Sequence, residues 1–481
     1  MTHRPDAPFS GPYLCSLSAR EVVSRLKSGE VHWRELVDAS ETRTKQTDGA
    51  VNAMVTHTFD RARTKGEAQL ASAQNQKNEA GWLAGLPLSI KDLSAVEGVK
   101  LTMGTPAMAD YIASENDPIV DLVENKGGLV IGKTNTPEMG AGGNTFNAVF
   151  GQTRNPWDVR KNAGGSSGGA AVSLASGQVW LAQGSDLAGS LRTPAAYCGV
   201  VGLRPTPGVA FGGPLNLGFT GEGVSGPMAR SVEDCALFLD AMAGYDERAP
   251  LSLPAPAKSY LQSVDEAEPD LRIAYAPTLN GFAPVESEIE GIMKAALHAV
   301  SAQGARVEEA CPKLDGLYKT YVTLRGLFWA TLPGRAPERV QWHYKRTLRE
   351  NIDVGRNLSV DDIVDANLTR TTLYHSMRTF LHDYDVLACA VVGLEPTLAE
   401  QEYPREVAGE PMSDYIDWLR FSFLATATGL PAISVPCGFT KSGMPVGIQL
   451  IGPPRGDAKV LQAAAVIEKT LALGTAPIDP R

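Results

Sequence analysis

Cysteine and histidine are scarce in this sequence, and neither is spaced for metal binding. The 481 residues include six cysteines and seven histidines. The cysteines are scattered, with no CxxC pair and no other spacing typical of metal ligands. This pattern excludes a disulfide framework and indicates reduced thiols in a cytoplasmic protein.

Long apolar runs and clusters of basic residues are also missing. No apolar run approaches the roughly 20 residues needed to cross a bilayer, and residues 1–20 lack the apolar stretch of a signal peptide. The formal net charge is −10 at pH 7, without any run of lysine and arginine. We therefore expect neither a membrane protein nor a nucleic-acid-binding surface. The length permits about three domains, but α/β enzymes of this size can form one compact unit.

Glycine and serine, in contrast, are concentrated between residues 164 and 205. Ser166 lies inside the segment GGSSGG, and Ser190 ends the segment DLAGS. Glycine accepts unusual backbone angles and lets a ligand come close. One such cluster would be typical of a flexible loop with incidental serines. Two clusters in one short stretch instead indicate a site built on two turns.

The residues between the two serines predict the elements that hold these turns. Residues 170–176 are small and favour a helix, and Gly177 fits the position just after its end. Residues 178–183 resemble a short buried strand. Beyond Ser190, Thr193 followed by Pro194 is typical of a helix N-cap and first turn. Both serines are thus expected at element ends, where backbone N–H groups are free to face a ligand.

A second candidate, Lys91, follows the apolar segment Leu86–Ile90, which predicts a short strand. Taken alone, a lysine at such a strand end is most simply a solvated surface charge.

Residues 127–134 match the phosphate-loop pattern G-x4-G-K-[ST], but their surroundings do not fit it. A phosphate loop needs a strand before its first glycine and a helix after its lysine. Here a helix is predicted before Gly127, residues 129–132 are apolar and strand-like, and Pro137 opposes a following helix. We therefore predict a structural role for Lys133 and no nucleotide site.

The motifs GGSSGG and GSDLAGS, followed by Arg192, Pro194 and Cys198-Gly199, resemble the amidase signature family. The resemblance extends from about residue 18 to residue 471. It implies an α/β fold with a central mixed β-sheet flanked by helices and a helical covering region. We expect one domain over residues 1–481, with N-terminal helices (1–80), a catalytic core (81–245), a variable covering region (246–425) and returning strands and a helix (426–481).

In that family a neutral lysine acts on the nucleophilic serine through a bridging serine. Carried over, Ser190 is the nucleophile, Ser166 the bridge, preceded by a cis peptide bond, and Lys91 the base. The surroundings suit this assignment, because a lysine must be desolvated to act as a base and Lys91 follows apolar residues.

The resemblance also implies backbone groups that bind the substrate. The N–H groups expected to bind the developing oxyanion belong to Leu187, Ala188, Gly189 and Ser190. Gly140 and Gly142, in a glycine-rich loop, are expected to lie beside the scissile group. The implied reaction is hydrolysis of a carbon–nitrogen acyl bond in a small-molecule amide, aryl acylamide or carbamate, with esters as further substrates. No metal or organic cofactor is implied, and a homodimer stays open.

Two positions depart from the family pattern. Ala188 stands where the family usually has glycine, and alanine resists positive φ. Thr426 stands where the family often has asparagine, so a supporting hydrogen bond is in question.

Three alternatives stay open at the level of sequence. A histidine could be the base, because catalytic groups assemble in space rather than along the chain. The chain could be the glutamine-hydrolysing subunit of a tRNA-dependent amidotransferase, although Thr206–Phe211 stands where that subunit has a tyrosine-glycine-arginine segment. It could also be a non-catalytic binding protein on the same fold, which intact Lys91, Ser166 and Ser190 disfavour.

Overall fold

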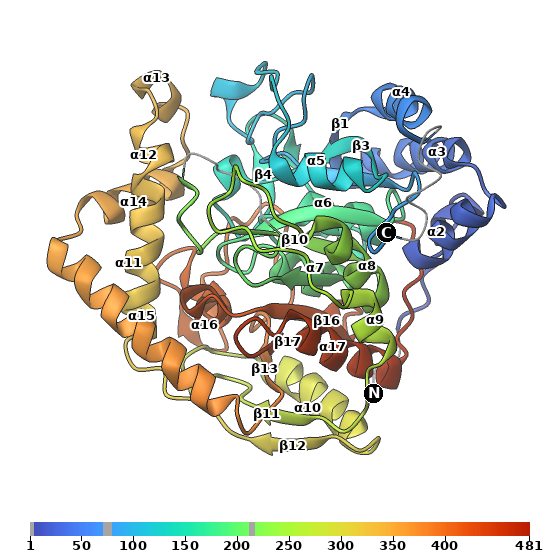
Figure 1. Cartoon of the computed structure of the whole chain (residues 1–481). Coiled ribbons are helices and arrows are strands. Elements are labelled where there is room, and N and C mark those ends of the chain that lie inside the picture. Colours follow the sequence, from blue (N-terminus) through green and yellow to red (C-terminus); the bar gives the residue numbers. More distant parts are fainter. Residues whose placement is uncertain (1–3, 71–78, 211–216) are drawn as a thin grey trace.

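The computed structural model describes residues 4–70, 79–210 and 217–481 (Figure 1). Within them an 11-stranded sheet runs through the molecule. In spatial order its strands are β1 (Met54–His57), β3 (Leu129–Thr134), β2 (Pro87–Lys91), β8 (Leu181–Asp186), β10 (Val224–Ala229), β9 (Val201–Arg204), β16 (Ala432–Phe439), β17 (Pro445–Ile451), β13 (Val386–Ala390), β11 (Arg272–Tyr275) and β12 (Arg306–Glu309).

The sheet is mixed, as expected from the resemblance. Strands β3, β2 and β8 are parallel neighbours, and so are β13, β11 and β12. Between these two groups, β8, β10, β9, β16, β17 and β13 pair in antiparallel fashion. Short two-stranded ribbons lie outside the sheet: β4 (Phe146–Asn147) with β5 (Gly151–Gln152), β6 (Arg154–Asn155) with β7 (Asp158–Asn162), and β14 (Glu406–Val407) with β15 (Glu410–Pro411).

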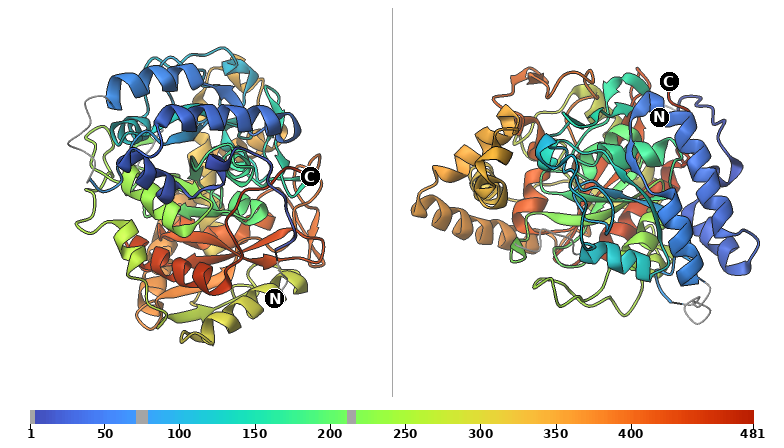
Figure 2. Two further views of the ribbon diagram at one scale, coloured as in Figure 1. Left: turned by 90° about the vertical axis from the view of Figure 1, so that its right-hand side faces the viewer. Right: turned by 90° about the horizontal axis from the view of Figure 1, so that it is seen from above.

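Helices surround the sheet. The N-terminal helices and the covering helices lie at opposite sides of the molecule (Figures 1 and 2). The N-terminal group is α1 (Tyr13–Ser16), α2 (Ala19–Ser28), α3 (Trp33–Val51) and α4 (Phe59–Leu70). The covering group is α11 (Leu317–Ala330), α12 (Leu332–Arg335), α13 (Glu338–Gln341), α14 (Arg346–Arg356) and α15 (Val360–Phe380). The remaining helices are α5 (Pro118–Asn125), α6 (Gly168–Ala175), α7 (Arg192–Cys198), α8 (Val232–Met242), α9 (Tyr260–Asp265), α10 (Ser287–Ser301), α16 (Phe423–Thr428) and α17 (Asp457–Leu471), with 3-10 turns at Pro106–Met108, Glu138–Gly140 and Asp417–Ser422. Among the helices in the described ranges, none has both the length and the apolar character needed to cross a membrane.

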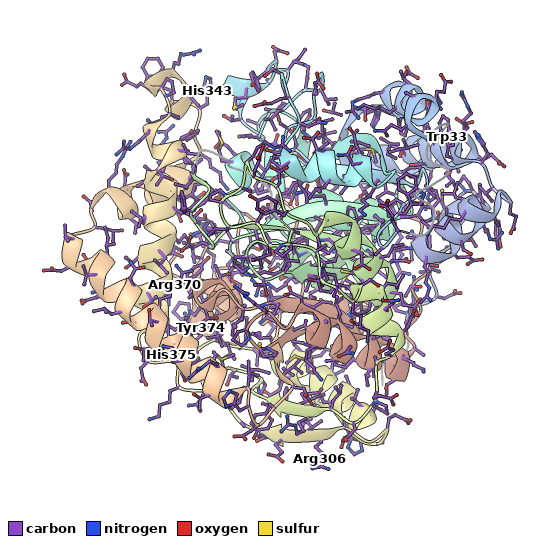
Figure 3. The ribbon with its side chains drawn as sticks, viewed as in Figure 1. Trp33, Arg306, His343, Arg370, Tyr374 and His375 are labelled. Atoms are coloured by element: carbon purple, nitrogen blue, oxygen red, sulfur yellow. The ribbon has the colours of Figure 1, made fainter. Side chains whose placement is uncertain are left out.

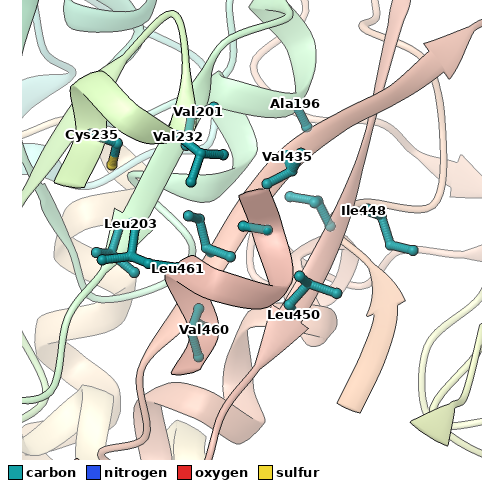
Figure 4. Packing of buried hydrophobic residues seen from close by; sticks show 14 of the residues in the cluster. Ala196, Val201, Leu203, Val232, Cys235, Val435, Ile448, Leu450, Val460 and Leu461 are labelled. Atoms are coloured by element: carbon teal, nitrogen blue, oxygen red, sulfur yellow. The ribbon is translucent and has the colours of Figure 1, made fainter. Parts of the chain in front are cut away.

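The buried core lies on both faces of the central strands. On one face, side chains of β9, β16 and β17 pack against α8 and α17; Figure 4 shows Val201, Leu203, Val435, Ile448 and Leu450 among them. Alternate residues point to the other face, where a Cβ on Gly202 would lie 2.3 Å from the Leu191 carbonyl oxygen, just before α7. Glycine at this position therefore lets the start of α7, which follows Ser190, lie directly on the sheet.

Two local predictions near the serines are wrong by a few residues. The strand predicted at 178–183 is β8, Leu181–Asp186. Gln178 instead lies in the turn that closes α6, where its N–H donates to the Ser173 carbonyl at 2.8 Å. Thr193 is not an N-cap, since α7 begins at Arg192 and the Thr193 N–H already donates to the Gly189 carbonyl at 2.7 Å. The predicted Gly177 position is confirmed by its φ of 77° after the C-cap Ser176.

The middle of the chain contributes strands to the central sheet as well as the covering helices. Residues 246–425, assigned from sequence to the covering region, also contribute β11, β12 and β13 to one end of the central sheet. The covering region is expected to be helical, yet within it Val386–Ala390 is a fully buried strand between β17 and β11. Phe211, the last residue of the segment in which this chain departs from the glutamine-hydrolysing type, lies outside the described residues.

Candidate active site

Two glycine-rich turns meet at the site. Ser166 precedes α6, and Ser190 lies between β8 and α7. The Ser167 N–H donates to the Ser190 carbonyl at 3.2 Å, which joins the two turns directly. The peptide bond between Gly165 and Ser166 is cis. Both serine side chains are almost completely buried, with 2% of Ser166 and 5% of Ser190 exposed.

Lys91, the last residue of β2, is fully buried against hydroxyl groups. Its Nζ lies 2.7 Å from Ser166 Oγ, 2.9 Å from Ser167 Oγ and 3.0 Å from Ser185 Oγ. Burial lowers the pKa of Lys91 to about 7, and the charge of Asp186 opposes only part of that shift. A lysine in this position exchanges its proton near neutral pH.

The neighbouring Lys133 is also buried, but its partner is a carboxylate and not a set of hydroxyl groups. It lies on β3, directly beside β2, and its Nζ forms a salt bridge to Asp92 at 3.0 Å. Burial lowers the pKa of Lys133 as well, but a carboxylate shares its charge. Because residues 129–134 are a strand preceded by α5, the phosphate-loop pattern is excluded and the structural interpretation of Lys133 is confirmed.

Asp186, at the end of β8, organises the turn that carries Ser190. Its carboxylate accepts hydrogen bonds from the Gly189 and Leu191 N–H groups at 3.0 and 3.2 Å. Arg192 donates to it from Nη2 at 2.8 Å and from Nε at 3.0 Å. Although burial alone would raise it, the charges of Arg192 and Arg204 and these hydrogen bonds hold the pKa of Asp186 at about 2. The hydrogen bonds of the turn therefore converge on a carboxylate that is ionised at neutral pH.

The backbone N–H groups of this turn are not equivalent. Gly189 donates to Asp186, whereas the N–H groups of Leu187, Ala188 and Ser190 have no acceptor among the described residues. Gly189 has a φ of +82°, while Ala188 is absent from the positive-φ residues of the described chain. Alanine therefore meets no backbone conflict at position 188, and three donors are left for a ligand.

Gly140 lies beside Ser166 and Gly142 lies beside Gly165, both in the loop 137–143. A Cβ on Gly140 would lie 3.6 Å from Ser166 Oγ and 2.8 Å from Leu93 Cδ1. A Cβ on Gly165 would lie 2.6 Å from the Gly142 carbonyl oxygen. The loop backbone thus contacts the serine turn so closely that a side chain at Gly165 would have no room.

The histidines lie away from these groups. All six in the described ranges are exposed, and none of them has a hydrogen bond to Lys91, Ser166 or Ser190. Figure 3 shows His343 beyond α13 and His375 on α15, both at the outer surface of the covering helices. No cluster of three or more His, Cys, Asp or Glu suited to a metal ion occurs in the part of the chain that the structure describes.

The structure adds polar partners that sequence reasoning missed. Ser167 and Ser185 also lie within hydrogen-bond distance of Lys91, at 2.9 and 3.0 Å. Both belong to the motifs already singled out, so their position was a usable signal. Thr426, one of the two departures from the family pattern, has a buried hydroxyl without a hydrogen-bond partner among the described residues. The family's supporting hydrogen bond at this position is thus not replaced by Thr426.

An apolar cluster, called here the apolar wall, adjoins the turns. It joins Met139, next to Gly140, and Leu187, in the serine turn, to the covering helices. Its other members are Ala141, Phe328, Trp329, Ala336, Val340, Tyr344, Leu348 and Ile352. Part of the covering region expected at residues 246–425 therefore reaches the site.

Comparison with known proteins gives one family. The family profile described as Amidase matches residues 35–461. An acylamidase from Rhodococcus erythropolis is 38% identical over 469 residues, covering 94% of this chain and 95% of the relative. A glutamyl-tRNA(Gln) amidotransferase subunit from Moorella thermoacetica is 32% identical over 486 residues, covering 94% of this chain and 96% of the relative. A solved bacterial aryl acylamidase of the amidase signature enzymes superposes with a TM-score of 0.87 at 29% identity, covering 95% of this chain and 96% of that chain.

These matches extend over nearly the whole chain and agree with the mixed sheet and the two serine turns. As the sequence motifs predict, the chain belongs to the amidase signature family.

Proposed function

We propose that this chain hydrolyses the carbon–nitrogen acyl bond of small non-peptide amides through an acyl-Ser190 intermediate. The observation that carries the proposal is the 2.7 Å distance between Lys91 Nζ and Ser166 Oγ in a buried site without a carboxylate partner for Lys91 among the described residues. A neutral amine there can accept a proton from a hydroxyl. The acylamidase that is 38% identical supports the same reaction class.

In the proposed reaction Lys91 takes the proton of Ser166 as Ser166 takes that of Ser190. The Ser190 oxygen attacks the substrate carbonyl carbon, and the carbonyl oxygen becomes an oxyanion. The free N–H groups of Leu187, Ala188 and Ser190 donate to it, and each such donor is typically worth about 3–4 kcal/mol of barrier. Return of the proton through Ser166 lets the amine leave. Water then attacks the acyl-serine and releases the acid.

The apolar wall favours an uncharged aryl or alkyl group on the substrate. Met139 and Leu187 are adjacent to the two serine turns and are continued by Phe328 and Trp329. Burying an apolar group against such side chains gains roughly 25 cal/mol per Å². Aryl acylamides therefore fit better than small charged amides, and carbamates and esters with similar groups are further candidates.

Glutamine hydrolysis for a tRNA-dependent amidotransferase is the second candidate, because a relative of that type is 32% identical over 94% of the chain. The same Lys91, Ser166 and Ser190 would perform it. A glutamine substrate carries an ammonium and a carboxylate group, and no member of the apolar wall has a charged side chain to pair with either.

A hydrolysis panel separates these functions. Wild type and Ser190→Ala would be assayed with an aryl acylamide, an aliphatic amide, a carbamate, an ester and glutamine. We expect release of aniline from the aryl acylamide by wild type only. Activity confined to glutamine would replace the proposal by the amidotransferase function. No turnover and no labelling by a fluorophosphonate would indicate a binding protein instead.

A further inference from the structure

The peptide groups of the turn 186–190 follow a regular pattern. In a trans peptide group the C=O and the following N–H point in opposite directions. A donor that holds the carbonyl on one side therefore sets the direction of the N–H on the other. Each free N–H of the turn shares its peptide group with the carbonyl of the preceding residue.

In each of the three peptide groups with a free N–H, the carbonyl oxygen accepts a hydrogen bond. The Asp186 carbonyl, behind Leu187 N–H, accepts from Arg204 Nη1 at 2.6 Å. The Gly189 carbonyl, behind Ser190 N–H, accepts from the Thr193 N–H at 2.7 Å. The Leu187 carbonyl, behind Ala188 N–H, accepts from the Tyr321 hydroxyl at 3.1 Å.

The remaining peptide group is arranged the other way round. Its N–H, that of Gly189, is already bound to Asp186, and its carbonyl, that of Ala188, has no donor among the described residues. In the four peptide groups from Asp186 to Ser190, the carbonyl therefore accepts a hydrogen bond where the N–H is free and has no donor among the described residues where the N–H is occupied. In the next peptide group both ends are bonded, the Ser190 carbonyl to the Ser167 N–H and the Leu191 N–H to Asp186.

Tyr321 differs from the other two donors because it comes from the covering helix α11. Its ring is buried and stacks on Phe423 with centroids 3.7 Å apart and an interplanar angle of 15°. One turn further along α11, Arg325 Nη1 lies 3.5 Å from the Tyr321 hydroxyl oxygen. Arg325 is held by Asn351 Oδ1 at 2.9 Å and by the Tyr415 hydroxyl. No carboxylate in the described chain forms a salt bridge with Arg325, so its charge acts on the phenol unneutralised.

We propose that Tyr321 is a positioning residue for the reaction. Its hydroxyl holds the Leu187–Ala188 peptide group so that the Ala188 N–H points at the oxyanion, and Arg325 keeps the hydroxyl in place. This inference rests on the proposed function of the turn. A hydrogen bond accepted at the carbonyl also polarises the N–H of the same peptide group, which strengthens it as a donor in a buried site. Through Tyr321 on α11, the covering helices would then affect the rate of hydrolysis as well as the binding of the substrate.

Tyr321→Phe tests this inference because it removes the hydroxyl and keeps the ring on Phe423. We expect kcat for an aryl acylamide to fall about tenfold with KM within about twofold, since a whole oxyanion donor is worth a hundredfold or more. The matched control is Tyr318→Phe. Tyr318 also lies on α11 against Phe423, but its hydroxyl donates to Asp417 at 2.7 Å, and kcat should stay at the wild-type value.

A second readout separates positioning from general loosening. A trifluoromethyl ketone that adds to Ser190 forms an oxyanion, whereas the product amine does not. In Tyr321→Phe the Ki of the ketone should rise by the factor by which kcat falls, and the Ki of the amine should be unchanged. Arg325→Gln keeps the Tyr321 hydroxyl but removes the positive charge beside it, and it should also lower kcat several-fold.

Wild-type kcat and ketone affinity in Tyr321→Phe would overturn the inference. Equal losses in Tyr321→Phe and Tyr318→Phe would also overturn it, because the cause would then be packing on Phe423. The proposed function fails separately, if Ser190→Ala keeps turnover. An inactive Ser190→Ala beside an unaffected Tyr321→Phe leaves the function standing and removes Tyr321 alone.

Discussion

The Nζ atom of Lys91 lies 2.7 Å from Oγ of Ser166, with two more serine hydroxyls within 3.0 Å. Lys133, on the adjacent strand, faces Asp92 instead. Two buried lysines side by side thus have different partners, one a carboxylate and the other only hydroxyl groups. The lysine that faces only hydroxyl groups, Lys91, has a pKa of about 7 because burial disfavours its charged form.

Removal of the Ser190 hydroxyl should abolish turnover. Ser190→Ala is expected to fold as the wild type does, because the change deletes one oxygen at a turn held by Asp186. Turnover and covalent labelling by a fluorophosphonate should both be lost. Mass spectrometry of the labelled wild type checks the site, and substantial activity in the folded variant would remove Ser190 as the nucleophile.

Substitution of Lys91 should remove amide hydrolysis even when the positive charge is kept. Arginine cannot give up its proton in a protein, so Lys91→Arg and Lys91→Ala should both lose activity by orders of magnitude. Ester hydrolysis should suffer less, because esters have better leaving groups. In wild type, kcat/KM should rise with pH through about 7 as Lys91 becomes neutral. An active Lys91→Arg enzyme would make Lys91 structural and return the search to the histidines.

Lys91 should also affect the pH dependence of stability. In the unfolded chain its pKa is about 10.4, and burial lowers it to about 7 in the folded protein. Between these values the unfolded state binds more protons, so the free energy of unfolding rises with pH. Relative to Lys91→Met, wild type should gain on the order of 2 kcal/mol between pH 7 and pH 9. Urea unfolding at both pH values measures it, and a constant difference would contradict the lowered pKa.

Breaking the charge arrangement at Asp186 should destabilise the protein. Asp186→Asn leaves Arg192 and Arg204 buried without their carboxylate, which typically costs about 3–5 kcal/mol. Chemical denaturation would show the loss. The control is Glu350→Gln, which breaks an exposed pair with Arg346 and should leave the midpoint unchanged. Equal midpoints for Asp186→Asn and wild type would mean that the turn does not depend on this ion pair.

Glycine at position 188 should change turnover by less than about tenfold. The backbone N–H is present in both residues, and position 188 lies outside the positive-φ residues of the described chain. Steady-state kinetics of Ala188→Gly checks this. Loss of a whole donor would cost roughly a hundredfold or more, so an effect of that size would assign Ala188 a different role, such as shaping the site.

The sequence by itself determined the family and the two serine turns, because these depend on local patterns. The mixed sheet could be expected only through the resemblance, since its neighbouring strands lie far apart in the sequence. Glycine and serine spacing sets a turn, and the structure places Gly177 just after the end of α6, as that pattern predicts. The lysine could be singled out only through the resemblance. A strand-end lysine looks the same in sequence whether it meets solvent, as the simplest interpretation had it, or a buried set of hydroxyls.

Tertiary structure decided what each of these groups faces. Asp92 and Asp186 are both carboxylates at strand ends. Asp92 neutralises Lys133 because strand order places β3 beside β2. Asp186 pairs with Arg192, six residues further along the chain, and also with Arg204 on β9. Tyr321 reaches the Leu187 carbonyl from 134 positions further along the chain. Such contacts depend on how distant segments pack, since a hydrogen bond is decided by distance and direction in space, which local spacing along the chain does not encode.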